Sequence, residues 1–571
     1  MRRLALVPLL MALGVLPVQA DVASPASGGL GTRVNGVIGG ACGSGVCSVS
    51  GGSDSGSNRF HRLSEFDTRG AIQGVLINSD GVGNVVLGVT AADGSFINKS
   101  VSFTSPAHLF LLSPGGIQLM PGASFQQIPQ LTLSTAAQLG FAGGVFDVYN
   151  TLVGSISSLG GNPSPGALGL LPGDAGDQLP WIRIDGVTID VDQALLVDAP
   201  GGRIDVDNSQ LSVSNPSGDG GTLTLTADLI RVGAGSDLLA TGTADGGLVQ
   251  VGGSWQNTDP TVRQAKQVWM QPGSTVDASS VGTGDGGTVV IWSDLSNPLG
   301  GTVVEGALLA RGGPAGGDGG QIETSGPYLV AMPEILDVSA PFGEGGDWLL
   351  DPYNLTIVAP GQTTVDMDIP TSPGNNLWPS MGDNAAISVD EIETQLVNGS
   401  DVTLLTGQGS TNQGGNIVWQ SGADLNYSSS SAANLTLDAS GYVQLNSNIK
   451  AGAGGLTINA GAGFVQAADD ITIDLLGPLE ISTGDSTIGT SGFSSPLFAA
   501  TLTGSGSLIK KGVGRLILSG NNSTWTGNTL VESGALRVTS ANALGSSMSP
   551  VSVQSAGTLE IDGGVTITNP I

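Results

Sequence analysis

The chain has 571 residues and a formal net charge of −30, with 18 Lys and Arg residues against 48 Asp and Glu residues. So few basic residues argue against a nucleic-acid-binding protein, because phosphate contacts need clustered Lys and Arg. The 92 Gly residues and a charged content of only 12% are unlike a helical protein, and a hydrophobic content of 39% argues against disorder.

The first 20 residues have the pattern of a secretory signal peptide. Arg2 and Arg3 precede an apolar run over residues 4–16, and small residues precede a cleavage site between Ala20 and Asp21. The apolar run is too short to span a bilayer as a helix. We therefore expect an exported protein.

The two cysteines, Cys42 and Cys47, are separated by four residues. In an exported chain the default interpretation of such a pair is a disulfide. Closing so short a loop should contribute about 2 kcal/mol to stability. Two cysteines without a neighbouring histidine cannot build a four-ligand zinc site. We expect no metal ion and no other cofactor.

One short segment next to these cysteines is similar to a catalytic motif. Residues 54–57 read Asp-Ser-Gly-Ser, as around the nucleophile of chymotrypsin-like proteases, but that fold places its histidine before the serine. The two histidines, His61 and His108, both follow Ser55, and further metal donors do not cluster around them. We interpret the segment as a polar turn and the histidines as coil or turn residues, and expect no catalytic residue.

Short apolar runs separated by Gly, Asn, Asp and Ser continue along the whole chain, a pattern typical of strands joined by tight turns. Asp-Gly-Gly precedes a run at Asp219, Asp245, Asp285 and Asp318, at intervals of 26, 40 and 33 residues. So loose a repeat indicates stacked coils with loops of variable length. It predicts an all-β fold, a right-handed parallel β-helix, with a string of β-sandwiches and a β-propeller as the alternatives.

A few polar and aromatic residues stand out from these runs. The pair Asp469-Asp470 could serve a glycosidase. We interpret the eight tryptophans as core or coil-capping residues, among them Trp181, Trp292, Trp348 and Trp525. The pair Lys510-Lys511 is interpreted as a solvated turn.

Three segments of the N-terminal part carry a resemblance to a known family. They read NRFHRLSEFDTRG from residue 58, HLFLLSPGGIQLMPGASF from residue 108, and TLSTAAQLGFAGGVF from residue 132. Together they resemble the N-terminal secretion domain of filamentous-haemagglutinin-like exoproteins, the exported partners of two-partner secretion. The resemblance implies that the secretion motif consists of Leu109, Phe110, Leu111, Leu112, Ser113, Pro114, Gly115, Gly116 and Ile117.

The motif departs from the family pattern at two turn positions, where the family has Asn. We expect Gly115 to keep the positive φ of the turn and Ser113 to bond to the local backbone. The apolar residues of the motif are expected to fill the interior of one coil. Turns are expected at residues 113–116 and 121–122.

Later segments extend the resemblance. Residues 316–326 and 346–357 are similar to segments that follow the secretion domain in large members of the family. Residues 506–538 and 541–563 resemble the passenger-associated repeat of autotransporter-type exoproteins. We therefore predict a signal peptide (1–20), a two-partner secretion domain (21–160), a stalk with Asp-Gly-Gly-headed coils (161–360), a β-rich stalk (361–500) and an apparently incomplete passenger-associated repeat (501–571).

The resemblance implies a bacterial adhesin, at the cell surface or released, and not an enzyme. Its expected partners are an outer-membrane β-barrel transporter that recognises the N-terminal domain, and a receptor or glycan on a host or neighbouring cell. Two alternatives stay open. The chain could be a carrier stalk for a C-terminal effector or toxin, or a β-helical enzyme that acts on a polysaccharide, although few basic residues are available to bind an acidic polymer.

Overall fold

The computed structural model describes residues 21–164, 170–171, 180–331, 333–362, 385–407, 414–427, 432–462, 465–484 and 497–571. The predicted signal peptide, with Ala20 of its cleavage site, lies outside these residues. Among the described residues, no helix is long and apolar enough to cross a membrane.

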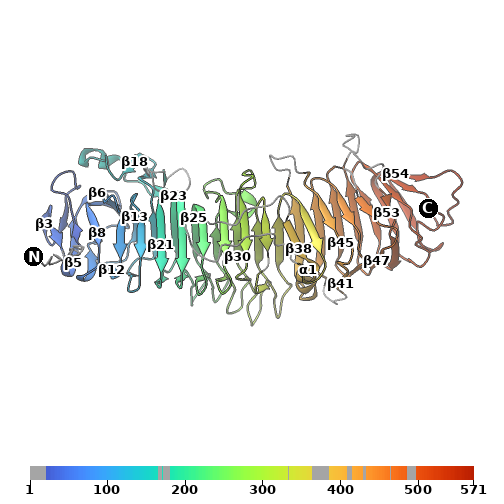
Figure 1. Ribbon diagram of the computed structural model, residues 1–571, viewed down its shortest axis with the longest axis horizontal. Helices are drawn as coiled ribbons and strands as arrows, with labels where there is room; N and C mark the ends of the chain where they lie inside the picture. The colour runs from blue at the N-terminus through green and yellow to red at the C-terminus, as the bar shows by residue number, and fades with distance from the viewer. Residues whose placement is uncertain are drawn as a thin grey trace, which may run out of the picture.

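The described chain winds into a long rod of stacked coils, a parallel β-helix with its two termini at opposite ends (Figure 1). Most strands pair in parallel with the strands one coil before and one coil after them, which builds three sheets along the rod. The predicted all-β, β-helical fold is confirmed.

The first sheet runs unbroken along the rod. Its strands, in order, are β7 (Asn58–Leu63), β10 (Asn84–Val89), β13 (His108–Leu112), β16 (Gln130–Ser134), β23 (Ala194–Asp207), β25 (Thr222–Val232), β27 (Leu248–Val251), β30 (Thr288–Trp292), β33 (Gln321–Ser325), β36 (Asp347–Asp351), β39 (Asp401–Thr406), β42 (Asn434–Ala439), β45 (Gly455–Ala460), β48 (Leu479–Thr483), β51 (Leu508–Lys511), β53 (Thr529–Val538) and β54 (Val551–Ile561).

The second sheet includes the C-terminal halves of β23, β25, β53 and β54, which pass around a corner of the coil. Its other strands are β8 (Glu65–Asp67), β11 (Ser95–Ile97), β14 (Ile117–Leu119), β21 (Trp181–Asp185), β28 (Gln267–Met270), β31 (Gly301–Val304), β34 (Leu329–Ala331), β37 (Leu355–Val358), β38 (Ala385–Ser388), β40 (Ile417–Trp419), β43 (Val443–Leu445), β46 (Val465–Ala467), β49 (Leu497–Phe498) and β52 (Arg515–Leu518).

The third sheet is divided into three blocks. The first contains β3 (Val37–Ile38), β2 (Thr32–Val34), β5 (Ser44–Gly51), β9 (Ala71–Ile77), β12 (Ser100–Phe103) and β15 (Ser124–Gln126). The second contains β22 (Thr188–Asp190), β24 (Gln210–Ser212), β26 (Asp237–Leu239), β29 (Thr275–Asp277), β32 (Ala307–Leu309) and β35 (Leu336–Asp337). The third contains β41 (Leu425–Asn426), β44 (Ile449–Ala451), β47 (Thr472–Leu475) and β50 (Thr501–Gly504).

The main core is a column of apolar side chains inside the coils. Side chains at paired positions of the first sheet stack on one another, for example Leu437 on Ile458 and Ile458 on Ile481, all fully buried. The apolar surface that they remove from water stabilises each coil only through its neighbours, as in other repeat folds.

The outer face of the first sheet differs between the two halves of the rod. Strands β39, β42, β45 and β48 show the alternating burial of a sheet with one face in water. Strands β10, β13, β30, β33 and β36 are buried almost throughout, because further chain covers their outer face. A continuous apolar run such as Leu109–Leu112 therefore marks a strand buried on both faces.

The cover over the N-terminal coils is a small antiparallel sheet outside the β-helix, at the upper left of Figure 1. It is formed by β17 (Gln138–Phe141), β18 (Gly144–Asp147), β19 (Pro163–Ser164) and β20 (Leu170–Leu171), next to the 3-10 helix η1 (Val153–Ser158). Between this sheet and the first sheet lies a second apolar cluster that includes Phe60, Phe110, Leu112 and Phe146.

Antiparallel pairing at the N-terminal end closes the first coil. Strand β1 (Val22–Ala23) pairs with β4 (Ala41–Cys42) and β8, and β6 (Ser53–Ser55) forms a hairpin with β7. Cys42 and Cys47 lie within this part and are joined by a disulfide, with their Cα atoms 5.7 Å apart. Among the described residues, these antiparallel pairings leave no long, flat strand edge at this end.

One coil departs from the pattern by replacing a strand with a helix. The helix α1 (Val389–Val397) buries Ile392 and Leu396 and takes the place on the third face between β35 and β41. The side chain of Gln395 donates to the Leu336 carbonyl at 3.0 Å, and Glu393 accepts the Asn426 backbone N–H at 3.0 Å. The helix is therefore hydrogen-bonded to the neighbouring coils through side chains, whereas a strand at this place would be bonded through its backbone.

Candidate functional site

The predicted secretion motif forms β13, the following turn and the start of β14. Side chains on a strand alternate between its two faces, so the four apolar residues of β13 separate into two pairs. Leu109 and Leu111 point into the main core, whereas Phe110 and Leu112 point outward into the second apolar cluster. The expectation that all of them fill the interior was wrong for Phe110 and Leu112.

The turn after β13 is held by Ser113. Its hydroxyl donates to the Gly116 carbonyl at 2.8 Å and accepts from the Ser95 hydroxyl at 2.9 Å, and the Gly116 N–H donates to the Ser113 carbonyl at 2.9 Å. The predicted local bond of Ser113 is confirmed, and a second turn follows at residues 121–122 as expected.

The prediction for Gly115 was wrong, because the positive φ of this turn belongs to Gly116, at 114°. A Cβ atom at position 115 would lie 2.5 Å from both the Ala91 carbonyl oxygen and the Gly94 nitrogen. Glycine is required there by the close approach of the preceding coil, and not by the conformation of the turn.

The resembling segment that begins at residue 58 lies on β7 and ties the outer sheet to the β-helix. The Asn58 amide donates to the Leu159 and Gly161 carbonyls at 2.7 Å each. The buried Arg62 guanidinium donates to four backbone carbonyls, those of Gly28, Asp147, Val148 and Thr151. Burial lowers the pKa of Arg62. A buried charge is tolerated here because these carbonyls replace its hydration.

The two histidines also lie on the first sheet. His61 of β7 is fully buried, with its Nδ1 atom 3.3 Å from the Thr32 hydroxyl, and burial, helped by the charge of Arg59, lowers its pKa to about 4. His108 begins β13, and burial lowers its pKa as well. Both histidines therefore lie on strands within coils of the β-helix, as one of the two expectations had it, and neither lies in a turn. Ser55 ends β6, and its hydroxyl donates to the Ser157 carbonyl at 3.2 Å.

The other predicted residues separate into buried and exposed ones. Trp292, Trp348 and Trp525 are buried, but Trp181 is 40% exposed and is therefore not a core residue. Asp469 and Asp470 form an exposed turn. Among the described residues, no group of three or more His, Cys, Asp and Glu side chains could hold a metal ion.

Lys510 lies at an inward position of β51, where sequence reasoning predicted a solvated turn. It pairs with Ile481 and Val531, is fully buried, and donates to the carbonyls of Gly512 and Ser533 at 3.2 and 3.4 Å. Burial lowers its pKa to about 8. Its neighbour Lys511 points outward and pairs with Glu480 at 2.6 Å.

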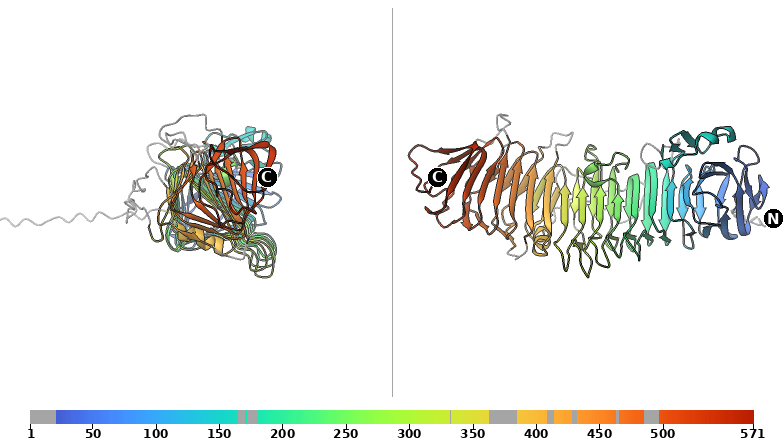
Figure 2. Two further views of the ribbon diagram at one scale, coloured as in Figure 1. Left: turned by 90° about the vertical axis from the view of Figure 1, so that its right-hand side faces the viewer. Right: turned by 180° about the vertical axis from the view of Figure 1, so that it is seen from behind.

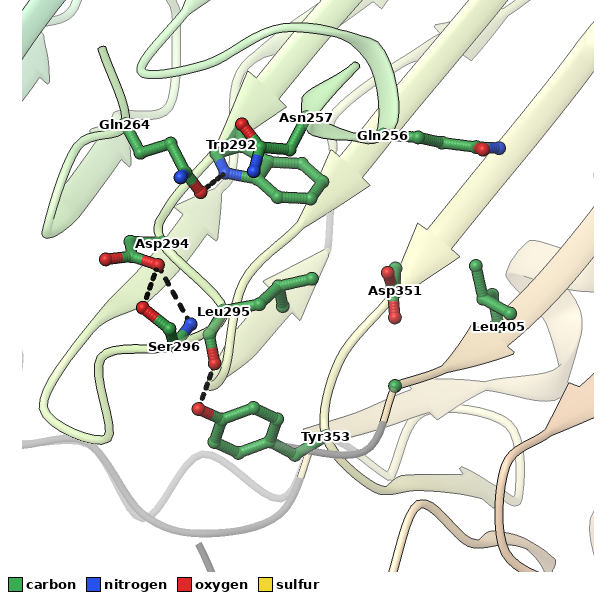
Figure 3. A pocket seen from close by; sticks show the side chains of 11 residues that line it. Gln256, Asn257, Gln264, Trp292, Asp294, Leu295, Ser296, Asp351, Tyr353 and Leu405 are labelled. Carbon is green, nitrogen blue, oxygen red and sulfur yellow. Dashed lines mark hydrogen bonds between the residues drawn. The ribbon is translucent and has the colours of Figure 1, made fainter. Parts of the chain in front are cut away.

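A cleft of about 790 Å³ opens on the outer face of the first sheet, where the N-terminal cover has ended (Figure 3). It is lined by Gln256, Asn257, Gln264, Trp292, Asp294, Leu295, Ser296, Asp351, Tyr353, Leu405 and Gly407. These residues come from distant parts of the chain that the coiling brings together. Sequence reasoning identified only Trp292 among them.

One side of the cleft is the loop over residues 252–266, which contains the 3-10 helix η2 (Trp255–Asn257). The loop is fixed to the first sheet by Arg263, whose Nε atom lies 3.0 Å from a carboxylate oxygen of the buried Asp198. The same guanidinium donates to the Leu170 carbonyl, which connects the loop to the outer N-terminal sheet. Burial raises the pKa of Asp198, and the charge of Arg263 opposes that shift.

Two buried carboxyl groups lie at the base of this region. Glu323 of β33 is fully buried and accepts the Gln256 N–H at 2.7 Å and the Ser325 hydroxyl at 2.9 Å. Burial raises its pKa to about 7. Asp351 of β36 lines the cleft, and burial together with the nearby charge of Glu323 raises its pKa to about 7, although the Gly407 N–H favours the charged form.

The loops with Asp-Gly-Gly project from one corner of the rod, where the end-on view superposes them as a bundle of green loops (Figure 2). Each aspartate accepts the backbone N–H of the residue that stands one coil later: Asp219 from Asp245, Asp245 from Asp285, Asp285 from Asp318, and Asp318 from Glu344. We call this row the aspartate ladder. The predicted repeat is confirmed. Glu344 extends the ladder by one more coil, although it does not belong to an Asp-Gly-Gly motif.

A family model matches part of the chain. Residues 508–538 match the passenger-associated-transport-repeat family. The match covers β51, β52 and β53, including the buried Lys510 and Trp525. No curated protein matches the chain. The predicted passenger-associated repeat is confirmed over these residues.

Proposed function

We propose that this protein is the passenger of a type V secretion system, exported to the bacterial surface or released, where it acts as an adhesin. The observation that carries the proposal is the passenger-associated-transport-repeat match at residues 508–538, set within the last coils of a parallel β-helix. The family's description associates this repeat with the transport of passenger proteins. The proposal gives the protein no catalytic activity.

The fold supports export through a narrow pore. Each coil of a parallel β-helix packs only against its neighbours, so the chain can cross a membrane unfolded and then fold coil by coil on the far side. Most apolar side chains of the rod are stacked in this sequential way, as Leu437 and Ile458 are. Folding outside would then favour movement in one direction.

We further propose the two-partner route, in which residues 21–160 are recognised by a separate outer-membrane transporter. Support comes from the segments that resemble the secretion domain of filamentous-haemagglutinin-like exoproteins. They meet in one unit, since β7, β13 and β17 share the second apolar cluster through Phe60, Phe110 and Phe141. Ring centroids of Phe60 and Phe141 lie 5.5 Å apart. A receptor or glycan on another cell is the proposed ligand of the stalk.

The test is export of the full chain from a bacterium that expresses it with or without a two-partner transporter. We expect surface-exposed or released protein only with the transporter. In its presence, Leu111→Asp should hold the chain in the periplasm, because the substitution buries a charge in the main core of the N-terminal coils. Leu225→Asp, at an equally buried inward position of β25, is the matched control beyond residue 160.

The two variants separate recognition from folding. If only folding of the rod matters, both variants lose export to the same extent, and the two-partner proposal is wrong. If the N-terminal unit is recognised, Leu225→Asp still reaches the surface and becomes sensitive to added protease. Surface levels of Leu111→Asp equal to those of the unsubstituted protein would contradict the proposal. Adhesion is then measured as binding of host cells to bacteria that display the protein.

A further inference from the structure

The cleft on the first sheet contains a buried acceptor without a partner. Asp351 is only 7% exposed, and its Oδ1 atom makes no hydrogen bond to any described residue. A buried carboxyl oxygen in this state costs free energy that a ligand donor could recover. Figure 3 shows Asp351 between Trp292 and Leu405 within the cleft.

Amide groups stand opposite this acceptor. The Gln264 side-chain oxygen accepts the Trp292 indole N–H at 3.0 Å, which orients the glutamine within the cleft (Figure 3). Gln256 and Asn257 add two exposed amides, and both residues have a positive φ, of 47° and 51°. A left-handed conformation at two consecutive residues with side chains costs free energy and is found most often at functional sites.

The remaining lining residues limit the chemical class of the ligand. No Lys or Arg is among the residues that line the cleft, and Asp294 and Asp351 are both acidic. An anionic polymer would therefore be repelled, all the more by a chain of net charge −30. The amide and carboxyl groups of the lining suit a ligand that has hydroxyl groups, whereas Trp292 and Tyr353, both buried, form part of the walls of the cleft.

We propose that this cleft binds a short stretch of a neutral glycan, with Asp351 accepting from a sugar hydroxyl and the Gln256, Asn257 and Gln264 amides bonding to others. A volume of about 790 Å³ is within the ordinary range for a small-molecule site. Glu323 is a positioning residue, since it holds the Gln256 backbone N–H and does not line the cleft. The inference deepens the proposed adhesin function and rests on it for its biological setting.

The test is titration of the purified full chain with neutral oligosaccharides, namely cellotetraose, maltotetraose, xylotetraose and mannotetraose, by isothermal calorimetry. Oligogalacturonate and tetralysine are the charged comparisons. We expect at least one neutral tetrasaccharide to bind, and oligogalacturonate not to bind. Asp351→Ala and Gln264→Leu should each weaken that binding at least tenfold, and Asp190→Ala, an exposed substitution on β22, should leave it unchanged.

Thermal unfolding of each variant checks that it is folded, and Gln264→Leu keeps the test valid if Asp351→Ala does not fold. The proposal is overturned if no neutral tetrasaccharide binds, if the folded variants bind as tightly as the unsubstituted protein, or if only tetralysine binds in an Asp351-dependent way. Because the measurement uses purified protein, it does not depend on export. Loss of export with intact glycan binding would contradict the proposed function alone.

Discussion

The backbone N–H of Asp318 donates to the carboxylate of Asp285 at 2.8 Å, although the two residues are 33 positions apart in the chain. The backbone N–H of Asp285 likewise donates to the carboxylate of Asp245, at 3.0 Å. The aspartate ladder therefore satisfies backbone groups at a corner where the strands have ended. Its cost is the repulsion between negative charges in neighbouring coils, which lie ~4.8 Å apart in a stacked sheet.

The ladder predicts opposite effects for two substitutions at Asp285. Asp285→Ala should lower the free energy of unfolding by about 1 kcal/mol, because it removes one exposed hydrogen bond. Asp285→Asn keeps an acceptor and removes a charge, so it should be neutral or slightly stabilising, most clearly at low salt. Urea unfolding at low and high salt measures both. If both variants lower the free energy of unfolding equally, the hydrogen-bond acceptor at position 285 does not contribute to stability.

The two apolar clusters on either side of β13 predict different local effects of similar truncations. Leu111→Ala and Leu112→Ala should each cost roughly 2–5 kcal/mol, as for other buried leucines. Hydrogen exchange distinguishes the two variants. Leu112→Ala should increase exchange in β17 and β18, whereas Leu111→Ala should increase it in β10 and β16. Identical exchange maps would contradict the separation of the two cores.

Burial of neutral His61 predicts loss of stability in acid. Its pKa is about 4 in the folded protein and 6.5 in an unfolded chain, so between these values the unfolded state binds more protons. The free energy of unfolding therefore falls as the pH decreases from about 6.5 to about 4, by up to ~3 kcal/mol from this group. His61→Gln should flatten that part of the profile relative to the unsubstituted protein.

The matched control for this prediction is His108→Gln, because His108 lies two coils away on the same sheet and is less buried. A profile of His61→Gln that keeps the full slope between pH 6.5 and 4 would show that another group is responsible.

The carboxyl groups near the cleft predict the opposite pH dependence. The pKa values of Glu323 and Asp351 are about 7 in the folded protein, against 4.5 and 3.8 in an unfolded chain. The folded state therefore binds more protons in this window, and the contribution of these groups to stability increases as the pH falls from about 7 to about 4.5. Glu323→Gln should remove its part of that increase, up to ~3 kcal/mol.

Because Glu323→Gln also removes a negative charge next to Asp351, the apparent pKa of Asp351 should fall in this variant. Chemical denaturation at a series of pH values measures the difference from the unsubstituted protein, with the exposed Asp190→Asn as control. A difference between the two proteins that does not change with pH would rule out proton uptake at Glu323.

The buried Lys510 predicts unequal effects for the two neighbouring lysines. Lys510→Met keeps most of the side-chain volume but leaves carbonyls without their donor, so it should cost about 1–3 kcal/mol. Lys511→Ala removes only a partly exposed ion pair and should cost less than about 1 kcal/mol. Thermal unfolding compares them. Equal costs would contradict the inward position of Lys510.

The pKa of Lys510 adds a signature above neutral pH. With values of about 8 in the folded protein and 10.5 in an unfolded chain, its contribution to stability increases as the pH rises between them. Lys510→Met should lack this increase.

The fold could be predicted from the sequence because its signals are local and repeated. Apolar runs and turn residues recur along the whole chain, Asp-Gly-Gly recurs in its middle part, and the family match at residues 508–538 covers the strands β51, β52 and β53. The pattern is less informative where a second layer covers the rod. From the sequence of Leu109–Leu112 alone, a strand whose apolar residues all enter the main core looks the same as a strand whose residues alternate between the main core and a second apolar cluster.

The helix α1 had a signal that strand-based reasoning missed. Ser388 and Glu391 have the spacing of a capping box, and Ile392 and Leu396 lie four residues apart, as on one face of a helix. Lys510 had no such signal, because a polar pair beside Gly normally indicates a turn. Its burial depends on carbonyls of the next coil, 23 residues later at Ser533.

The cleft could not be predicted because coiling, and not sequence proximity, brings its residues together. Gln264, Trp292 and Asp351 come from three different coils. Their spacing in the chain depends on the lengths of intervening loops, which carry no fixed period. The raised pKa of Glu323 likewise depends on burial beneath a loop from an earlier coil, since its carboxylate accepts the Gln256 N–H from 67 residues before it.

The helix α1 has a mechanical consequence for the rod. The first sheet is an unbroken ladder of backbone hydrogen bonds from β7 to β54, whereas the third sheet is interrupted between β15 and β22 and again between β35 and β41, where α1 stands. Side-chain contacts such as that of Gln395 with Leu336 are softer than a strand ladder. The rod is therefore unequally stiff: it resists stretching along its first sheet and bends more readily by opening its third face, at α1 or at the break between β15 and β22.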